Sequence, residues 1–442
     1  MKQLEKNIFK ISWPIFLELL FFTLLGTVDT IMLSNYSDTA VGSVGVSNRI
    51  LNLIAILVNI VAAGIGVVVA QYLGANQIKK AKDAAVTGVV GNFILGIFLS
   101  GILIFFGEWF IHLIGTNDIF IDDSVIYLKI VGFSTLFISL RVGLSTIFRS
   151  FSHPKVVMYI MGVGNLVNIV MNAILIYGLF GIPSLGVEGA AIGTLVARIV
   201  MVLLLIIYTY KILNIKLHKI RFYVEHLKKI LFVGIPSALE NVMYNIAQII
   251  ILVFVNRMVP DAVIAQSYIA LILSFVFIFS FSFAIGNSII VGYYIGEGEF
   301  EKAHKETNHT IKIAFITLFV VTSLLNIFAY PLISLFTSNP EITKMIRQVL
   351  YLSLFIEIGR SMNLVFISAL RSAGDTIFPV VMAVISMFGI SVVFSYLFGL
   401  RLELGILGVF IATAMDEIFR GFSMFIRWQS KKWMNMNLLN IK

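Results

Sequence analysis

Twelve apolar segments, each long enough to cross a lipid bilayer, alternate with short polar links along the chain. We place them near residues 11–33, 47–72, 84–106, 125–148, 156–180, 187–210, 231–256, 263–292, 310–336, 347–369, 377–399 and 404–428. A spanning helix needs about 20 mostly apolar residues. Charged residues make up only 12% of the chain, against about 25% in soluble domains. We therefore predict an all-α membrane protein with twelve transmembrane helices.

The second half of the chain repeats the first. Pro14 and Pro236 are 222 residues apart, and the same offset pairs Glu18 with Glu240 and Gly64 with Gly286. Near the end the offset becomes 219, which aligns GVEGAAIGT with GILGVFIAT. Six helices return the chain to the side from which it started, so the repeat is parallel. We predict two pseudo-symmetric six-helix bundles, residues 1–210 and 230–442, joined by an amphipathic cytoplasmic linker, residues 211–229.

Basic residues gather in alternate links, such as Lys79, Lys80 and Lys82, whereas the opposite links are acidic, as at Asp122 and Asp123. By the positive-inside rule, we expect both termini in the cytoplasm and a multi-pass protein of the cell membrane. The formal net charge of +9 is spread over many links, so no nucleic-acid partner is expected. The first apolar segment lacks a small-residue cleavage pattern and is expected to be retained as a span.

Two acids interrupt the first apolar segment. Glu18 and Asp29 are eleven residues apart, which at roughly 100° per residue places both on one stripe of a helix. A carboxylate in hydrocarbon is costly and therefore usually faces a cavity or a partner. The repeat copies the first acid as Glu240 but puts Ile251 at the position of Asp29. The ionisable chemistry is thus concentrated in the first bundle.

Several motifs in this order resemble the multidrug and toxic compound extrusion (MATE) family. They are WPIFLELL with GTVDTIMLS, QYLGANQIKKA, NLVNIVMNAILIYG, GVEGAAIGT, LRSAGD and RWQSKKW, and the match covers essentially the whole chain. The resemblance implies a V-shaped pair of six-helix bundles around a central cavity. It also implies a secondary active antiporter that exports organic cations in exchange for protons or sodium ions.

Asp29 is the strongest candidate for the coupling site, a role that the resemblance also implies. Asn168 and Asn172 share one helical face with Asn165, and Thr194 lies in the next predicted helix. Carboxylate, amide and hydroxyl oxygens suit a hard cation, so Asp29, Asn168, Asn172 and Thr194 are expected to bind a proton or a sodium ion. Hydrogen bonding between helices is the alternative role of the asparagines and the one favoured for Asn165.

Four further acids are candidates for the substrate path: Glu18, Glu240, Glu357 and Asp416. They could attract cationic substrates. For the symmetric pair Glu18 and Glu240, a structural role is an equal alternative. For Asp416, the i,i+4 spacing to Arg420 favours an internal ion pair, and Glu357 has a similar neighbour in Arg360. Arg141 and Arg198 are expected to pair with some of the acids.

We expect export of amphipathic organic cations by a monomer in contact with membrane lipids. A lipid-linked precursor flippase is the first alternative, but it would need several cationic side chains inside its cavity, where acids outnumber Arg141, Arg198 and Arg360. An integral membrane enzyme is the second. The six histidines do not cluster, and no phosphate-binding loop or Ser-His-Asp order emerges. We therefore expect neither an enzyme nor a cofactor.

Cysteine substitution tests the predicted topology, since the chain has no cysteine of its own. The variants Asn76→Cys, Ser152→Cys and Gly298→Cys should be protected from an impermeant thiol reagent in intact cells. The variants Ser37→Cys, Asn117→Cys and Ser338→Cys should react. Labelling of the first set together with protection of the second would reverse the orientation.

Overall fold

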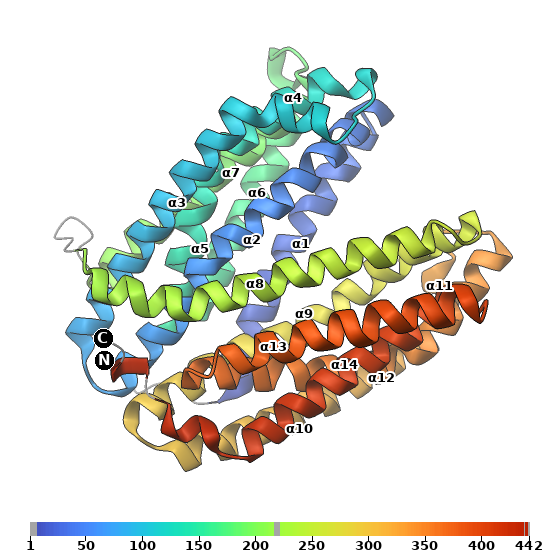
Figure 1. The fold of residues 1–442 in the computed structure, drawn as a ribbon. Coiled ribbons are helices and arrows are strands. Elements are labelled where there is room, and N and C mark those ends of the chain that lie inside the picture. Colours follow the sequence, from blue (N-terminus) through green and yellow to red (C-terminus); the bar gives the residue numbers. More distant parts are fainter. Residues whose placement is uncertain (1–6, 216–221, 437, 441–442) are drawn as a thin grey trace. The chain divides into compact units, whose positions relative to one another are not determined.

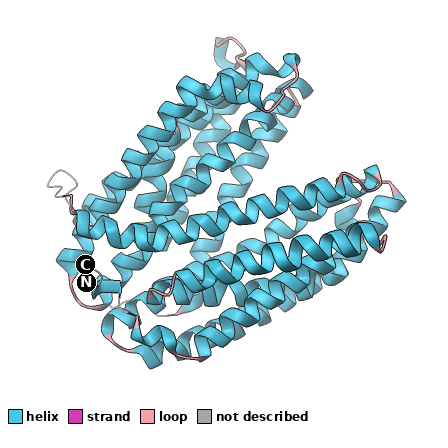
Figure 2. Ribbon diagram, in the orientation of Figure 1, coloured by secondary structure: helices cyan, strands magenta, loops and turns pink. Residues whose placement is uncertain are grey.

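The computed structural model describes residues 7–215, 222–436 and 438–440, and these residues form helices and loops without a strand (Figure 1, Figure 2). The predicted linker, residues 211–229, and the two chain ends therefore lie partly outside the described residues. The all-helical class predicted from the apolar segments is confirmed.

The described residues of the first half of the chain form seven α-helices. They are α1 (Ile8–Ser34), α2 (Asp38–Gly74), α3 (Ile78–Leu113), α4 (Asp118–Phe133), α5 (Thr135–Ser150), α6 (Pro154–Tyr177) and α7 (Gly186–Tyr208). A short 3₁₀ turn, Leu179–Gly181, follows α6, and a π-helical turn, Thr209–Leu213, extends α7.

In the second half, the residues that the structure describes also form seven α-helices. They are α8 (Val224–Val255), α9 (Pro260–Glu297), α10 (Phe300–Ile327), α11 (Ala329–Ile333), α12 (Pro340–Ala373), α13 (Ile377–Ser386) and α14 (Gly405–Gln429). Two π-helical stretches, Met387–Val392 and Ser395–Arg401, continue α13. The short 3₁₀ helices Lys432–Asn435 and Leu438–Asn440 follow α14.

Each of the twelve predicted spans coincides with a helix or a pair of helices. Ten helical segments in the described part are long and apolar enough to cross a membrane, and α4 and α5, bent by 41°, form an eleventh span together. The twelfth is α14, which repeats the span α7 but carries Asp416, Glu417 and Arg420 near its middle. The prediction of twelve transmembrane helices is confirmed. The V-shaped arrangement of the two bundles stays a prediction.

The chain divides into two compact units. Unit 1 contains Trp13–Leu73 and Gln77–Ile235, and unit 2 contains Pro236–Lys442, Gly74–Asn76 and the N-terminal stretch that ends at Ser12. The first turns of α8 thus belong to unit 1, where the backbone of Ile230 lies against Gly64. The first turns of α1 belong to unit 2, where Ser12 lies against Gly286. From the sequence, we assigned residues 230–235 to the second bundle and expected the seventh span to begin near residue 231. In the structure, this helix begins seven residues earlier, at Val224.

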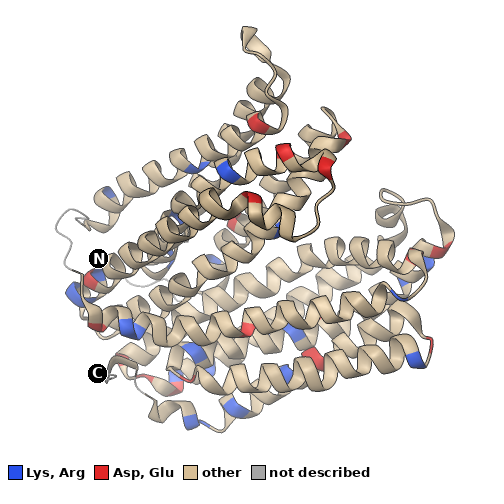
Figure 3. Cartoon of the chain, turned by 45° about the horizontal axis from the view of Figure 1, so that its top comes forward, with Lys and Arg blue, Asp and Glu red and all other residues tan. Residues whose placement is uncertain are grey.

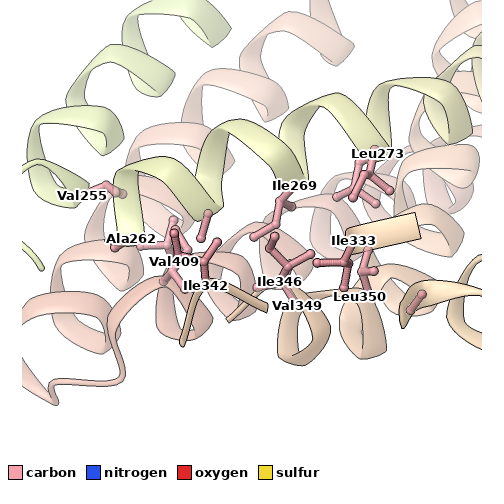
Figure 4. Close-up of a cluster of buried hydrophobic side chains, with 14 of the residues drawn as sticks. Val255, Ala262, Ile269, Leu273, Ile333, Ile342, Ile346, Val349, Leu350 and Val409 are labelled. Carbon is pink, nitrogen blue, oxygen red and sulfur yellow. The ribbon is translucent and has the colours of Figure 1, made fainter. Parts of the chain in front are cut away.

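Each unit has its own apolar core. In unit 2, α9 and α12 pack along their length, and aliphatic side chains such as Ile269, Ile346 and Val409 interlock where these helices meet α14 (Figure 4). In unit 1, Leu33, Val131 and Ile176 belong to a corresponding cluster around α1, α4, α6 and α7. These packed helices fix the positions of the few polar side chains inside each unit.

Glycines at the start of α7 and α14 show the repeat in three dimensions. Gly186 and Gly405 both have positive φ, +52° and +59°, which favours glycine because other residues are strained there. Three residues later, a Cβ on Gly189 would lie 2.6 Å from the carbonyl oxygen of Leu175. A Cβ on Gly408 would lie 2.6 Å from the carbonyl carbon of Phe398. The glycines of the two motifs aligned at an offset of 219 therefore have the same structural role, which is close packing against a neighbouring backbone.

The two halves differ at several places, among them the break between α10 and α11 where α3 is continuous. The α4–α5 span is broken at Ser134, whereas its repeat, α12, is continuous. The straight helix α6 is repeated by α13 with its π-helical continuation. π-helical turns and helix breaks free backbone groups and occur often at functional sites. These places mark where the two copies have diverged.

We predict that Gly189→Val and Gly408→Val destabilise the protein by about 1–3 kcal/mol each, because the new side chain has no room beside a packed backbone. Thermal unfolding of the purified protein in detergent measures the effect. Gly101→Ala is the matched control, since nothing lies within 4 Å of a Cβ at that helical position. Unfolding temperatures that stay at the wild-type value in both valine variants would refute the close-packing argument.

Candidate functional site

The carboxylate of Asp29 lies inside unit 1 among neutral side chains. Asp29 is 7% exposed, and Asn172 Nδ2 donates a hydrogen bond to its Oδ1 at 2.6 Å. Thr194 Oγ1 donates to its Oδ2 at 3.4 Å, and Asn168 Nδ2 donates to the Thr194 hydroxyl at 3.5 Å. The structure thus brings together the four residues predicted to form the coupling site, from α1, α6 and α7. In the described part of the chain, Asp29 forms no salt bridge.

Asn172 keeps one unused group beside Asp29. Its Oδ1 is buried and has no hydrogen-bond partner. A half-turn of the amide would exchange the N–H donor for this oxygen, which is the acceptor that a protonated acid or a bound cation requires. The cage can therefore serve an ionised Asp29 in one amide orientation and a neutralised Asp29 in the other.

Small residues of α7 let the helix approach α6 closely enough to form this cage. Gly193 lies directly against the side chain of Asn172, where a Cβ would collide with Oδ1. The next residue, Thr194, then reaches Asp29. Asn165 has a different role, because its Nδ2 donates to the backbone oxygen of Phe21 at 2.8 Å. It joins α6 to α1, as the sequence favoured.

Glu18 and Glu240 each lie beside an arginine, and the two ion pairs are copies of one another. Arg149 NH1 lies 3.4 Å from Glu18 Oε1, and Arg371 forms the equivalent pair with Glu240. The offset of 222 relates both members of the pair. Sequence reasoning did not connect these arginines with the acids. The signal was present, because both members of the pair are duplicated together.

Unit 2 contains a buried cluster of alternating charges. Arg420 pairs with Asp416 at 2.7 Å and with Glu417 at 3.3 Å, and Arg360 bridges Glu417 and Glu357. The ion pairs expected from the i,i+3 and i,i+4 spacings are therefore present. Ser386 donates to Asp416, and Asn363 donates to Glu417. The sequence missed Glu417 as the centre of the cluster.

Glu357 is the exception in this cluster. It is fully buried, yet only Oε1 contacts an arginine, and Oε2 has no hydrogen-bond partner. Three acids face two arginines here, so the cluster carries one unbalanced negative charge when every acid is ionised. Figure 3 shows charged residues as isolated turns within long uncharged helices. In such apolar surroundings an uncompensated charge is costly.

Neither Arg141 nor Arg198 forms the expected salt bridge in the described part of the chain. Arg198 instead contacts the Ser134 hydroxyl and the carbonyl oxygen of Val131, at the break between α4 and α5. Its guanidinium thereby satisfies a carbonyl that the broken helix leaves open. Arg141 has no such backbone partner.

Three of the four positions in unit 2 that repeat the Asp29 site are apolar, and the fourth, Thr413, repeats Thr194 at the offset of 219. Ile251, Ile390 and Phe394 stand at the offset of 222 from Asp29, Asn168 and Asn172. Ile390 and Phe394 border an apolar groove of about 410 Å³, which α14 completes with Met415, Ile418, Phe419 and Phe422. The described residues contain no cluster of three or more His, Cys, Asp or Glu side chains placed to hold a metal ion. A cation at Asp29 would thus rely on one carboxylate and neutral oxygens.

Comparison with known proteins agrees with the repeat. The model of the MatE family matches the chain twice, at residues 14–174 and 236–397. An uncharacterized transporter, YisQ of Bacillus subtilis, is 36% identical over 98% of this chain and 96% of its own. A probable multidrug resistance protein, NorM of Thermotoga maritima, is 27% identical over 98% of this chain and 93% of its own.

Solved structures share the fold. An outward-facing multidrug resistance MATE family transporter of the MOP superfamily matches with a TM-score of 0.88 and 21% identity, over 96% of this chain and 95% of its own. A MOP superfamily transporter from Pyrococcus furiosus, described as having a binding pocket of reverse polarity, matches with a TM-score of 0.88 and 22% identity over the same shares.

The two buried sites should respond differently to mutation. Arg420→Met should destabilise the protein by about 3–5 kcal/mol, because it leaves Asp416 and Glu417 without their shared counter-charge. Asp29→Asn should unfold within a few degrees of wild type, since the carboxylate that it removes has no salt bridge to lose. Thermal unfolding in detergent compares the two. The opposite ranking would show that Asp29 is a structural residue.

Proposed function

The chain belongs to the MatE family of membrane transporters, and on this premise we propose that it is a secondary active antiporter of the cell membrane. It exports amphipathic organic cations and is driven by the entry of protons or sodium ions at Asp29. Both termini lie in the cytoplasm, and the protein works as a monomer.

The observation that carries this proposal is a buried carboxylate held only by neutral groups. A coupling ion drives transport only if it binds the alternative conformations with different affinities. An ionised Asp29 is tolerable while water reaches it, but enclosing it in hydrocarbon is costly. Closure of unit 1 around Asp29 therefore requires a proton or a cation. Asn168, Asn172 and Thr194 supply the oxygens that accept either one.

The substrate class rests on two observations. Glu18 lies in unit 1, where only Oε1 contacts Arg149 and the buried Oε2 has no hydrogen-bond partner, so the carboxylate keeps one oxygen for a cation once the surrounding helices open. The groove between α14 and the segment that continues α13, at Ile390 and Phe394, is lined by apolar and aromatic side chains. It suits the apolar part of an amphiphile. Relatives named as multidrug resistance proteins fit the same class.

A lipid-linked precursor flippase would have to hold a pyrophosphate with several free cationic side chains. In unit 2, Arg360, Arg371 and Arg420 are all engaged with carboxylates. This engagement favours the efflux proposal over the flippase.

We predict that Asp29→Asn abolishes efflux that is driven by an ion gradient, because the amide cannot take up a proton or carry the charge that attracts a cation. The measurement is ethidium uptake into proteoliposomes of inverted orientation, under an imposed pH gradient and, separately, an imposed sodium gradient. Asn168→Ala and Thr194→Ala each remove one neutral hydrogen bond and should reduce coupling by about threefold.

Asp118→Asn is the matched control, since Asp118 is an exposed acid in the first turn of α4. Binding of ethidium to purified Asp29→Asn protein, measured in parallel, should stay near the wild-type affinity. An Asp29→Asn variant that still concentrates ethidium under either gradient would remove Asp29 from the coupling site.

A further inference from the structure

We propose that α2 presents a water-facing polar stripe to the substrate path of unit 1, and that Arg49 in this stripe selects monovalent organic cations over divalent ones. This inference rests on the proposed export of organic cations and refines its substrate class. A fixed positive charge beside the path repels a dication about twice as strongly as a monocation.

The α2 stripe is a run of exposed small and polar residues along one face of the helix. Its members are Gly45, Arg49, Asn52, Asn59 and Ala63. They follow one another at steps of three, four or seven residues, which keeps them on one side of an α-helix. All five are exposed. The stripe therefore faces away from the packed interior of unit 1.

Another helix of unit 1 shows what a lipid-facing stripe looks like. The exposed residues along α3 are large and apolar, among them Ile94, Phe98, Phe105 and Trp109. Side chains of this kind suit contact with hydrocarbon. Ionisable side chains within a span face the bundle interior or a water-filled cavity. Since the α2 stripe is exposed and contains an arginine, the cavity is the environment that fits it.

The depth of the stripe supports contact with water. Val44 of α2 packs in one cluster with Leu33, the residue at which the first predicted span ends. At 1.5 Å per residue, Arg49 lies about 7 Å further along α2 and Asn59 about 22 Å further. The hydrocarbon core is about 30 Å thick. A long arginine side chain can reach back to the membrane surface, but the short side chain of Asn59 cannot.

Arg49 is the one charge of the stripe, and the fold does not need it. Among the described residues it has no hydrogen bond, ion pair or aromatic contact. The repeat places Leu271 at the same position of α9, where it is 40% exposed. A leucine thus serves the helix equally well in unit 2. The charge in unit 1 is available to act on whatever passes the stripe.

Repulsion of cations is the action that this geometry supports. Firm capture of an anion needs several convergent donors, and a single exposed charge pair is weak in water. Repulsion between like charges needs no precise geometry, and it grows with the charge of the ligand. In a wet path, one nearby unit charge changes the affinity by about threefold for each ligand charge.

Thiol labelling tests whether the stripe faces water, because the chain has no cysteine of its own. Arg49→Cys, Asn52→Cys and Asn59→Cys in full-length protein in nanodiscs should react with the water-soluble cation trimethylammonioethyl methanethiosulfonate, as measured by mass spectrometry. Phe98→Cys is the matched control, since this position is 64% exposed on the apolar face of α3 and should stay unlabelled. Unreactive Asn52→Cys and Asn59→Cys would overturn the water-facing stripe.

The label then tests the charge selectivity in one folded protein. Arg49→Cys receives a cationic, a neutral or an anionic label from trimethylammonioethyl, methyl or sulfonatoethyl methanethiosulfonate. Ethidium and propidium share a ring system, but propidium carries a second cationic group. By fluorescence anisotropy, the neutral label should bind propidium about tenfold more tightly than the cationic label, and ethidium about threefold. The anionic label should strengthen both further, in the same order.

Asn52→Cys keeps the test decisive if Arg49→Cys does not fold. Its cationic label adds a second positive charge beside Arg49 and should weaken propidium more than ethidium. Arg347→Cys, at an exposed arginine of unit 2 beside Tyr351, is the control, and the same labels should change both affinities there by less than twofold. Equal effects on the two dyes, or none, at Arg49→Cys and Asn52→Cys would overturn the selectivity.

These measurements need no ion gradient, so they are separate from the test of the proposed function. Ethidium export by the wild-type protein under an imposed gradient leaves that function standing even if the label charge has no effect. Charge-dependent binding without export under either gradient overturns the export function and leaves the charge selectivity of the stripe. Absence of both overturns the two proposals together.

Discussion

The cost of an ionised side chain in hydrocarbon organises both units of this protein. In unit 2, this cost is offset by a shared network of ion pairs, in which Arg360 and Arg420 both contact Glu417. In unit 1, the cost of the ionised side chains is offset only in part. Among the described residues, Glu18 pairs with Arg149, whereas Asp29 has neutral hydrogen-bond donors and Arg141 forms no salt bridge. Groups whose charge the fold leaves unbalanced are the ones that a proton, a cation or a substrate can balance.

The duplication distinguishes the features that both halves share from the features that only one half has. The close-packed glycines Gly189 and Gly408 occur in both halves, and so do the ion pairs of Glu18 and Glu240 with their arginines. Asp29, by contrast, corresponds to Ile251 in the repeat. Two other positions of the polar cage, Asn168 and Asn172, correspond to Ile390 and Phe394, which border the apolar groove of unit 2. This difference fits the proposal that the cation binds in unit 1.

The sequence predicts much of the fold because apolar length and the constant repeat offset are local, countable signals. It also predicts the Asp29 cage, since Asn168 and Asn172 share a helical face and Thr194 lies in a run of small residues. Sequence reasoning did not pair Arg149 with Glu18, because 131 residues separate them and the only signal is that both recur at the offset of 222. The break at Ser134 is equally hidden. No proline or glycine stands at that residue. The bend is stabilised by Arg198 of α7, which follows Ser134 by 64 residues.

The chemistry of hydrogen bonding explains why a neutral cage, and not an arginine, suits the coupling site that we propose at Asp29. A guanidinium can only donate, so a carboxylate locked between arginines, such as Glu417, is held in its ionised form. An amide or a hydroxyl can donate to an ionised acid and can accept from a protonated one or bind a cation. Asn172 and Thr194 can therefore stabilise Asp29 both before and after it takes up its ion. The asymmetry between the two units thus follows from one requirement, that a coupling group must be stable in two charge states.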